Sequence, residues 1–143
     1  MPGKPFDVSL GIRHLVCGSC NGCEHEVNAL GAPQYDSTQY GYDIVASPRH
    51  ADVLTVTGPM TEAMRDPALA TRDAMAEPRI VVAVGDCAIG TGAWCNAGSA
   101  GAGAGGELDA EVHVPGCPPT PDAIIRGLHE AARLLDLRAG RKR

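Results

Sequence analysis

Ile80-Val81-Val82-Ala83-Val84 is the stretch that decides the fold, and Gly85-Asp86-Cys87 follows it directly. Five consecutive apolar residues, four of them β-branched, predict a strand that is buried on both faces. Such strands are typical of a parallel sheet covered by helices, in which ligands bind at the carboxyl ends of the strands. The run therefore places Cys87 where an α/β protein holds its ligand.

Similar segments on either side predict the rest of the sheet. Further strands are expected at 12–16, 42–46, 53–57 and 111–114. Helices are expected at 24–30, 61–76 and 122–137. In the second helix Thr61 is the expected N-cap, and Pro67 predicts an initial loop or a break. The alternation of strands and helices predicts an α/β sandwich with a mostly parallel sheet.

The chain of 143 residues is expected to form one domain, over residues 12–137. Residues 1–11, punctuated by Gly and Pro, are expected to be an N-terminal arm, and 138–143 a basic tail. Residues 98–106 consist of Gly, Ala and Ser, which predicts a flexible loop without fixed structure.

Charge and hydropathy restrict the function. A formal net charge of −5 argues against nucleic acid as a partner, because phosphate binding needs a basic surface. The longest apolar run is too short to cross a bilayer, and the first residues lack the apolar stretch of a signal peptide. A cytoplasmic location is expected, where six cysteines are more readily metal ligands than disulfides.

The cysteines are the candidate site. Three lie in Cys17-Gly18-Ser19-Cys20-Asn21-Gly22-Cys23, at a predicted turn from strand to helix, and two more, Cys87 and Cys117, each follow a predicted strand. Four thiolates bind either zinc or an iron–sulfur cluster. Structural zinc sites usually use two C-x-x-C pairs, so one local group with two single cysteines makes zinc the weaker alternative. The spacing leaves open which two of the three local thiols bind.

Several motifs together resemble one known family. They run in order along residues 12–137 and include Ser19-Cys20-Asn21-Gly22-Cys23, Ala32-Pro33-Gln34-Tyr35-Asp36, Ala46-Ser47-Pro48-Arg49-His50-Ala51-Asp52, Gly85-Asp86-Cys87-Ala88 and Val114-Pro115-Gly116-Cys117-Pro118-Pro119. The sequence is similar to the B subunit of NADH–quinone oxidoreductase (the 20 kDa, PSST-type subunit) and to the small subunits of group 4 membrane-bound [NiFe] hydrogenases.

The resemblance implies a flavodoxin-like fold and one [4Fe-4S] cluster held by Cys20, Cys23, Cys87 and Cys117. It implies a place on the inner face of the cell membrane, beside a hydrogenase-like or complex I-like large subunit, a ferredoxin-type iron–sulfur subunit and membrane subunits. The separated pair Cys20 and Cys23 is similar to the hydrogenase branch, because complex I subunits usually carry two adjacent cysteines there. The loop between Cys95 and Asp109 is shorter and richer in glycine than in complex I subunits.

Other residues receive weaker predictions. Cys17 and Cys95 are outside the shared ligand pattern, and the favoured interpretation of both is a spare thiol. The alternatives for Cys17 are that it replaces Cys20 as a ligand or that it lies close to the cluster. The resemblance implies a proton-carrying or potential-tuning role for Glu26, and it places Arg49 and His50 close to the cluster. The leading hypothesis is therefore an electron-transfer subunit with no complete active site of its own. A quinone-reducing complex I-like subunit and a zinc-stabilised structural module are the alternatives.

Overall fold

The computed structural model describes residues 9–140, and these form an α/β fold around a five-stranded, all-parallel sheet. The strand order is β2-β1-β3-β4-β5, which is the flavodoxin-like order of doubly wound folds. The fold predicted from the sequence is confirmed. The strands are β1 (Leu10–Val16), β2 (Tyr42–Ile44), β3 (Val53–Thr57), β4 (Ile80–Val84) and β5 (Val112–Val114).

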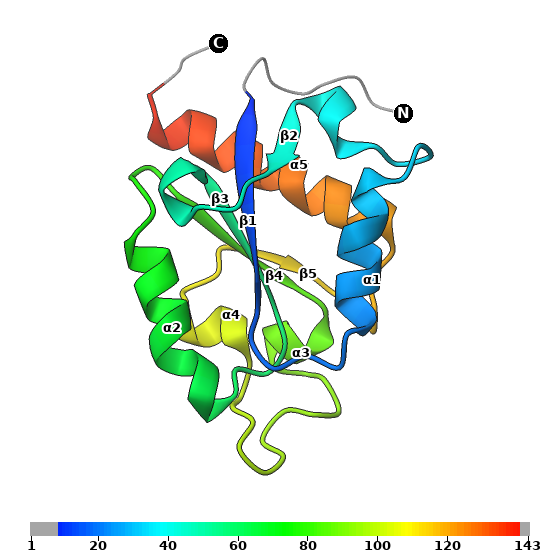
Figure 1. Cartoon of the computed structure of the whole chain (residues 1–143), viewed down its shortest axis with the longest axis vertical. Coiled ribbons are helices and arrows are strands. Elements are labelled where there is room, and N and C mark those ends of the chain that lie inside the picture. Colours follow the sequence, from blue (N-terminus) through cyan, green and yellow to red (C-terminus); the bar gives the residue numbers. More distant parts are fainter. Residues whose placement is uncertain (1–8, 141–143) are drawn as a thin grey trace.

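Helices cover both faces of the sheet. Figure 1 shows α1 and α5 on one side and α2 and α4 on the other, with α3 below the sheet at the end where β4 finishes. The α-helices are α1 (Gly22–Asn28), α2 (Glu62–Asp73), α3 (Asp86–Ile89), α4 (Ala104–Glu107) and α5 (Pro121–Arg138). Short 3-10 turns are η1 (Ala29–Gly31), η2 (Ser37–Tyr40) and η3 (Pro48–His50). Among residues 9–140, no helix is long and apolar enough to cross a membrane.

The interior strand β4, between β3 and β5, separates two hydrophobic cores. Ile80, Val82 and Val84 pack with α1 and α5, while Val81 and Ala83 pack with α2 and α4. All five residues are buried, as the uninterrupted apolar run predicts. The sheet is therefore fixed from both sides, and the loops at its carboxyl edge start from rigid strands.

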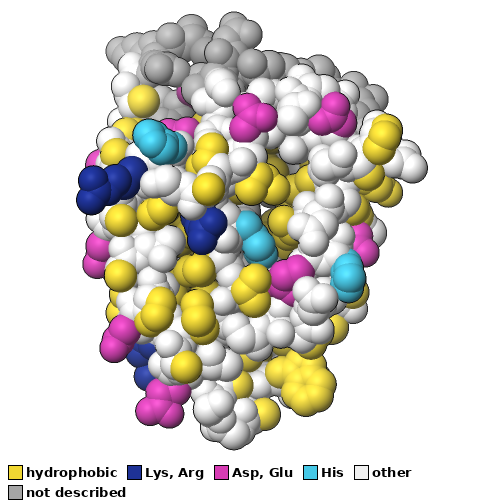
Figure 2. Space-filling view, viewed as in Figure 1, with side chains coloured by type: hydrophobic (Ala, Val, Ile, Leu, Met, Phe, Trp, Pro, Cys, Tyr) yellow, Lys and Arg dark blue, Asp and Glu magenta, His cyan; other side chains and the backbone are white. Residues whose placement is uncertain are grey.

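The side of β1 that pairs with β2 is less covered than the side that pairs with β3. β2 pairs with β1 only from Leu10 to Ile12, so the end of β1 at Val16 has no neighbouring strand on that side among the described residues. Val16 and Ile44 are exposed there. Figure 2 shows hydrophobic side chains through the middle of this face of the molecule.

Some boundaries differ from the prediction. Leu10 and Gly11, assigned to the arm, belong to β1 because Leu10 pairs with Tyr42, and Arg138, assigned to the basic tail, is the last residue of α5. Residues 1–8 and 141–143 lie outside the described residues, and with them most of the arm and half of the tail. Pro67 does not interrupt α2. The proline is exposed, whereas the next residue, Ala68, is fully buried, and packing of that face outweighs the missing N–H.

The Gly/Ala segment is also not a loop without fixed structure. Residues 104–106 lie in α4, and the preceding turn is bound to the β3–α2 loop by backbone hydrogen bonds, from Gly101 N to Met60 O at 2.7 Å and from Gly103 N to Pro59 O at 3.0 Å. A Cβ on Gly101 would lie 2.8 Å from the Met60 carbonyl oxygen. Glycine is required here for close backbone contact.

Candidate metal centre

Four cysteines reach the carboxyl edge of the sheet from three separate segments. Cys20 lies in the loop from β1 into α1, Cys23 in the first turn of α1, Cys87 in the first turn of α3 after β4, and Cys117 in the loop after β5. Figure 1 shows the connections from β1 to α1 and from β4 to α3 at this same end of the molecule. Cys20 and Cys117 are exposed, whereas Cys23 and Cys87 are half-buried.

Glycines allow the backbone to approach the sulfur atoms. Gly85 has a φ of +93°, and a Cβ there would lie 2.5 Å from Cys23 Sγ. A Cβ on Gly92 would lie 2.4 Å from Cys87 Sγ. Any side chain at these positions would displace a thiol. The sequence therefore builds a cradle around the two half-buried sulfurs.

The thiols also lie within electrostatic reach of one another. Burial raises the pKa of Cys23 to about 12, and the negative charge of Glu24 and of the thiolates at Cys20, Cys117 and Cys87 adds to that rise. Burial likewise raises the pKa of Cys87, and a hydrogen bond from the backbone N–H of Trp94 partly opposes this rise. Cys20, Cys117 and Cys87 therefore lie close enough to Cys23 to raise its pKa, and each thiolate makes the next harder to form unless a cation is present.

The other two cysteines are placed differently. Cys17 is fully buried among the side chains of the α2 face, such as Met60 and Ala68. Burial, with the charges of Glu107 and Glu24, raises its pKa to about 12, and the other cysteines are not among the causes. Cys95 is half-buried, and its thiol donates a hydrogen bond of 3.3 Å to the backbone carbonyl of Cys87.

A buried carboxylate adjoins the cysteine loop. Glu24 is only 7% exposed and accepts hydrogen bonds from the hydroxyls of Ser19 and Thr57. His14 Nε2 lies 3.7 Å from Glu24 Oε1, and His14 Nδ1 lies 3.0 Å from Thr55 Oγ1. Although burial opposes ionisation, the two hydroxyls hold the pKa of Glu24 below its ordinary value.

Sequence reasoning missed Glu24 and chose Glu26 instead. Glu26 is half-buried on α1 and has no hydrogen-bond or ion-pair partner among residues 9–140. A signal for Glu24 was present, since it precedes the apolar Val27 by three residues and so shares its helix face.

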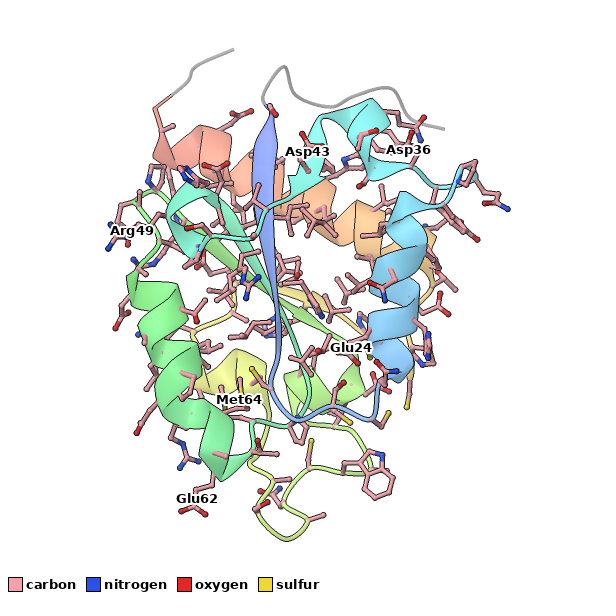
Figure 3. All side chains as sticks on the ribbon, in the orientation of Figure 1. Glu24, Asp36, Asp43, Arg49, Glu62 and Met64 are labelled. Atoms are coloured by element: carbon pink, nitrogen blue, oxygen red, sulfur yellow. The ribbon has the colours of Figure 1, made fainter. Side chains whose placement is uncertain are left out.

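The predicted position of Arg49 and His50 close to the cluster is not what the structure has. Their turn precedes β3, which places them at the amino edge of the sheet, and Figure 3 shows Arg49 and Glu24 well apart, on opposite sides of β1 in this view.

The exposed part of the site adjoins a surface hollow of about 320 Å³. Cys20 and the 58%-exposed Trp94 both line it, together with Pro59 and Thr61. Among residues 9–140, no three His, Cys, Asp or Glu side chains are arranged to hold a single metal ion.

Comparison with known proteins gives consistent similarities. The family described as NADH ubiquinone oxidoreductase, 20 kDa subunit, matches residues 20–131. Formate hydrogenlyase subunit 7 of Escherichia coli (strain K12) is 40% identical over 133 residues, which are 93% of this chain and 52% of that protein. The chain thus spans about half the length of that relative.

Two further matches agree with it. A probable membrane-bound hydrogenase subunit, mbhJ, of Pyrococcus furiosus is 39% identical over 117 residues, covering 82% of this chain and 70% of the relative. Among solved structures, a chain of the membrane-bound sulfane sulfur reductase, an archaeal respiratory membrane complex, superposes with a TM-score of 0.72 at 26% identity. That match covers 94% of this chain and 72% of the other.

Proposed function

Because this chain belongs to the NADH ubiquinone oxidoreductase 20 kDa subunit family, we propose that it is the electron-transfer subunit of a membrane-associated, hydrogenase-type oxidoreductase complex. It would hold one [4Fe-4S] cluster on Cys20, Cys23, Cys87 and Cys117. The partners proposed are a hydrogenase-like large subunit, a ferredoxin-type iron–sulfur subunit and membrane subunits. No complete active site is proposed on this chain.

The observation that carries the proposal is the convergence of four thiols at one edge of the sheet. Cys20, Cys87 and Cys117 all act on the pKa of Cys23, although they come from three loops. The family binds a [4Fe-4S] cluster through cysteines, and both the donor set and the glycine cradle fit that group. When bound, the cluster supplies one-electron transfer.

The residues of this chain give the site an inner and an outer side. Cys23 and Cys87 are half-buried against the sheet, whereas Cys20 and Cys117 are exposed, and Cys20 lines the same hollow as Trp94. An exposed pair of ligands brings the redox centre close to whatever docks on this face. That arrangement suits a subunit that receives an electron from one partner and delivers it to another.

Metal and sulfide analysis tests the proposal directly. The full chain, purified anaerobically with the subunits that accompany it, should contain about four iron atoms and four acid-labile sulfides per chain. Reduction with dithionite should then produce a [4Fe-4S] EPR signal. Zinc in place of iron, with no such signal, would establish the structural zinc module instead.

A second candidate follows from the family description itself, which names a ubiquinone oxidoreductase. In that case the electron would leave through a complex I-like large subunit to a quinone. The sequence of the large subunit distinguishes the two: two C-x-x-C pairs together with nickel in the purified complex support the hydrogenase type, and their absence supports the quinone type.

A further inference from the structure

We propose that Glu24 is a positioning residue that fixes the Cys20–Cys23 loop to β3 and lowers the midpoint potential of the cluster held there. This role for Glu24 rests on the proposed function, and Glu24 was not among the site residues predicted from the sequence. Its basis is the geometry around this carboxylate, which is buried one residue after Cys23.

The hydrogen bonds of Glu24 join the beginning and the end of the ligand loop. Ser19, directly before Cys20, donates its hydroxyl to Glu24 Oε2, and Asn21 N donates to Ser19 Oγ at 3.2 Å. On the other side, Thr57 at the end of β3 donates to Glu24 Oε1. The loop is therefore held in place by one side chain that contacts both the loop itself and the central sheet (Figure 3).

The same geometry favours a negative charge on this group. Each carboxylate oxygen has a hydroxyl partner that can donate to it, and hydrogen bonds of this kind favour the ionised form of a carboxyl group. The nearest basic group is His14, with 3.7 Å between Nε2 and Oε1. Burial lowers the pKa of His14, and a neutral imidazole does not cancel the negative charge.

A negative charge beside the cluster opposes the arrival of an electron. Glu24 directly follows the proposed ligand Cys23 in the chain and is buried, so its charge lies beside the place where the cluster would be held. Reduction by dithionite passes one electron to the cluster and breaks no bond, so it adds one negative charge at the same place. The carboxylate is largely shielded from solvent, and its effect is only weakly screened.

The first experiment separates the effect of the Glu24 charge from the effect of the shape of its side chain. Glu24→Gln keeps the length of the side chain and removes its charge, and we expect the one-electron equilibrium constant for reduction to rise about tenfold, which is about 59 mV. Glu130→Gln, an identical change on the exposed part of α5, should leave the potential unchanged. The measurement is an EPR-monitored redox titration of the anaerobically purified complex. An unshifted potential in Glu24→Gln, or a larger shift in Glu26→Gln, would overturn the charge effect.

The second experiment examines the positioning without changing any charge. Thr57→Val removes one of the two hydroxyls that hold Glu24, whereas Thr55→Val removes a hydroxyl on the same strand that contacts His14. We expect Thr57→Val to release iron to a chelator at least several-fold faster than Thr55→Val does. Equal rates of release would overturn the positioning role. Wild-type protein without iron would refute the proposed function itself, while a normal cluster unaffected by these substitutions would refute only this inference.

Discussion

Asp86 and Gly116 are joined by two reciprocal hydrogen bonds. The backbone N–H of Asp86 donates to the Gly116 carbonyl at 2.9 Å, and the Gly116 N–H donates to Asp86 Oδ1 at 2.8 Å. Each residue directly precedes a proposed ligand, Cys87 or Cys117. The pair therefore sets the separation of two ligands that are thirty residues apart in the chain.

Removing the side chain of Asp86 should loosen this pair. Asp86→Ala leaves the Gly116 N–H without its acceptor, and the free energy of unfolding should fall by about 1–2 kcal/mol. Iron content per chain should fall as well, because Cys117 is no longer held opposite Cys87. Asp86→Asn retains an acceptor oxygen and is the control. Chemical denaturation and iron analysis measure both effects, and equal iron content in the Ala and Asn variants would contradict the expectation.

Gly85 should tolerate no side chain. With φ at +93°, Gly85→Ala introduces backbone strain, and its Cβ would lie 2.5 Å from Cys23 Sγ. Gly98→Ala is a matched control, because Gly98 also has a positive φ, of +60°, but has no neighbouring atom within 4 Å of a Cβ. We expect both variants to lose about 1–2 kcal/mol of stability from the strain. Only Gly85→Ala should lose the cluster, as measured by visible absorption and iron content.

The sequence predicted well what depends on local pattern. The apolar run at 80–84 indicated a central parallel strand, and the rule for strand ends placed Cys87 and Cys117 at one edge of the sheet. The exact choice of ligands came from the family resemblance, and it stays a prediction. Buried Cys17 and the thiol convergence on Cys23 support that choice.

What the sequence did not reveal depends on contacts between distant segments. Glu24 and Glu26 are both acidic residues on one short helix, and only the packing of α1 on β3 brings Glu24 to Thr57. The 98–106 segment appeared flexible because its glycines have no local partner, while the backbone of residues 58–60 that binds it lies far away in the sequence. Arg49 and His50 directly precede the strand predicted at 53–57, so the sequence already indicated its amino end, and the expectation that they lie close to the cluster came from the family resemblance alone.

Stability should depend on pH through His129. Tyr42 Oη lies 2.6 Å from His129 Nδ1, and burial lowers the pKa of His129 from its ordinary value of 6.5. The unfolded chain therefore binds a proton near pH 6.5, where the folded chain does not yet bind one. The contribution of His129 to the free energy of unfolding should be constant above about pH 7.5 and fall as the pH drops below 6.5, by at most about 1.4 kcal/mol per pH unit for one proton.

Substitution identifies the histidine responsible. His129→Gln should reduce the slope of unfolding free energy against pH between 7 and 5, although His14, whose pKa is also lowered, maintains part of it. His113→Gln, at an exposed position on β5, is the control for replacing a histidine elsewhere in the fold. Denaturation curves at several pH values provide the measurement. An equal slope in wild type and His129→Gln would show that this residue does not contribute.

Cys17 and Cys20 lie in the same loop, yet their substitution should have opposite consequences. Cys17 is fully buried in the α2-side core, and its backbone carbonyl accepts a hydrogen bond from Met60 N at 3.0 Å. Cys17→Ser places a hydroxyl in apolar surroundings, which should cost about 1–3 kcal/mol of stability while the cluster remains. Cys20 is exposed, so Cys20→Ser should cost the cluster-free protein almost no stability, but the cluster should be lost or converted.

Cys23→Ser, Cys87→Ser and Cys117→Ser should behave like Cys20→Ser, and Cys95→Ser should keep the cluster. Iron analysis and EPR report the cluster, and denaturation of the cluster-free chains reports the stability, so the two effects are read separately. This separation matters because a variant that merely misfolds also loses iron. Loss of the cluster in a stably folded Cys17→Ser protein, with retention in Cys20→Ser, would show that Cys17 and Cys23 are the local ligands.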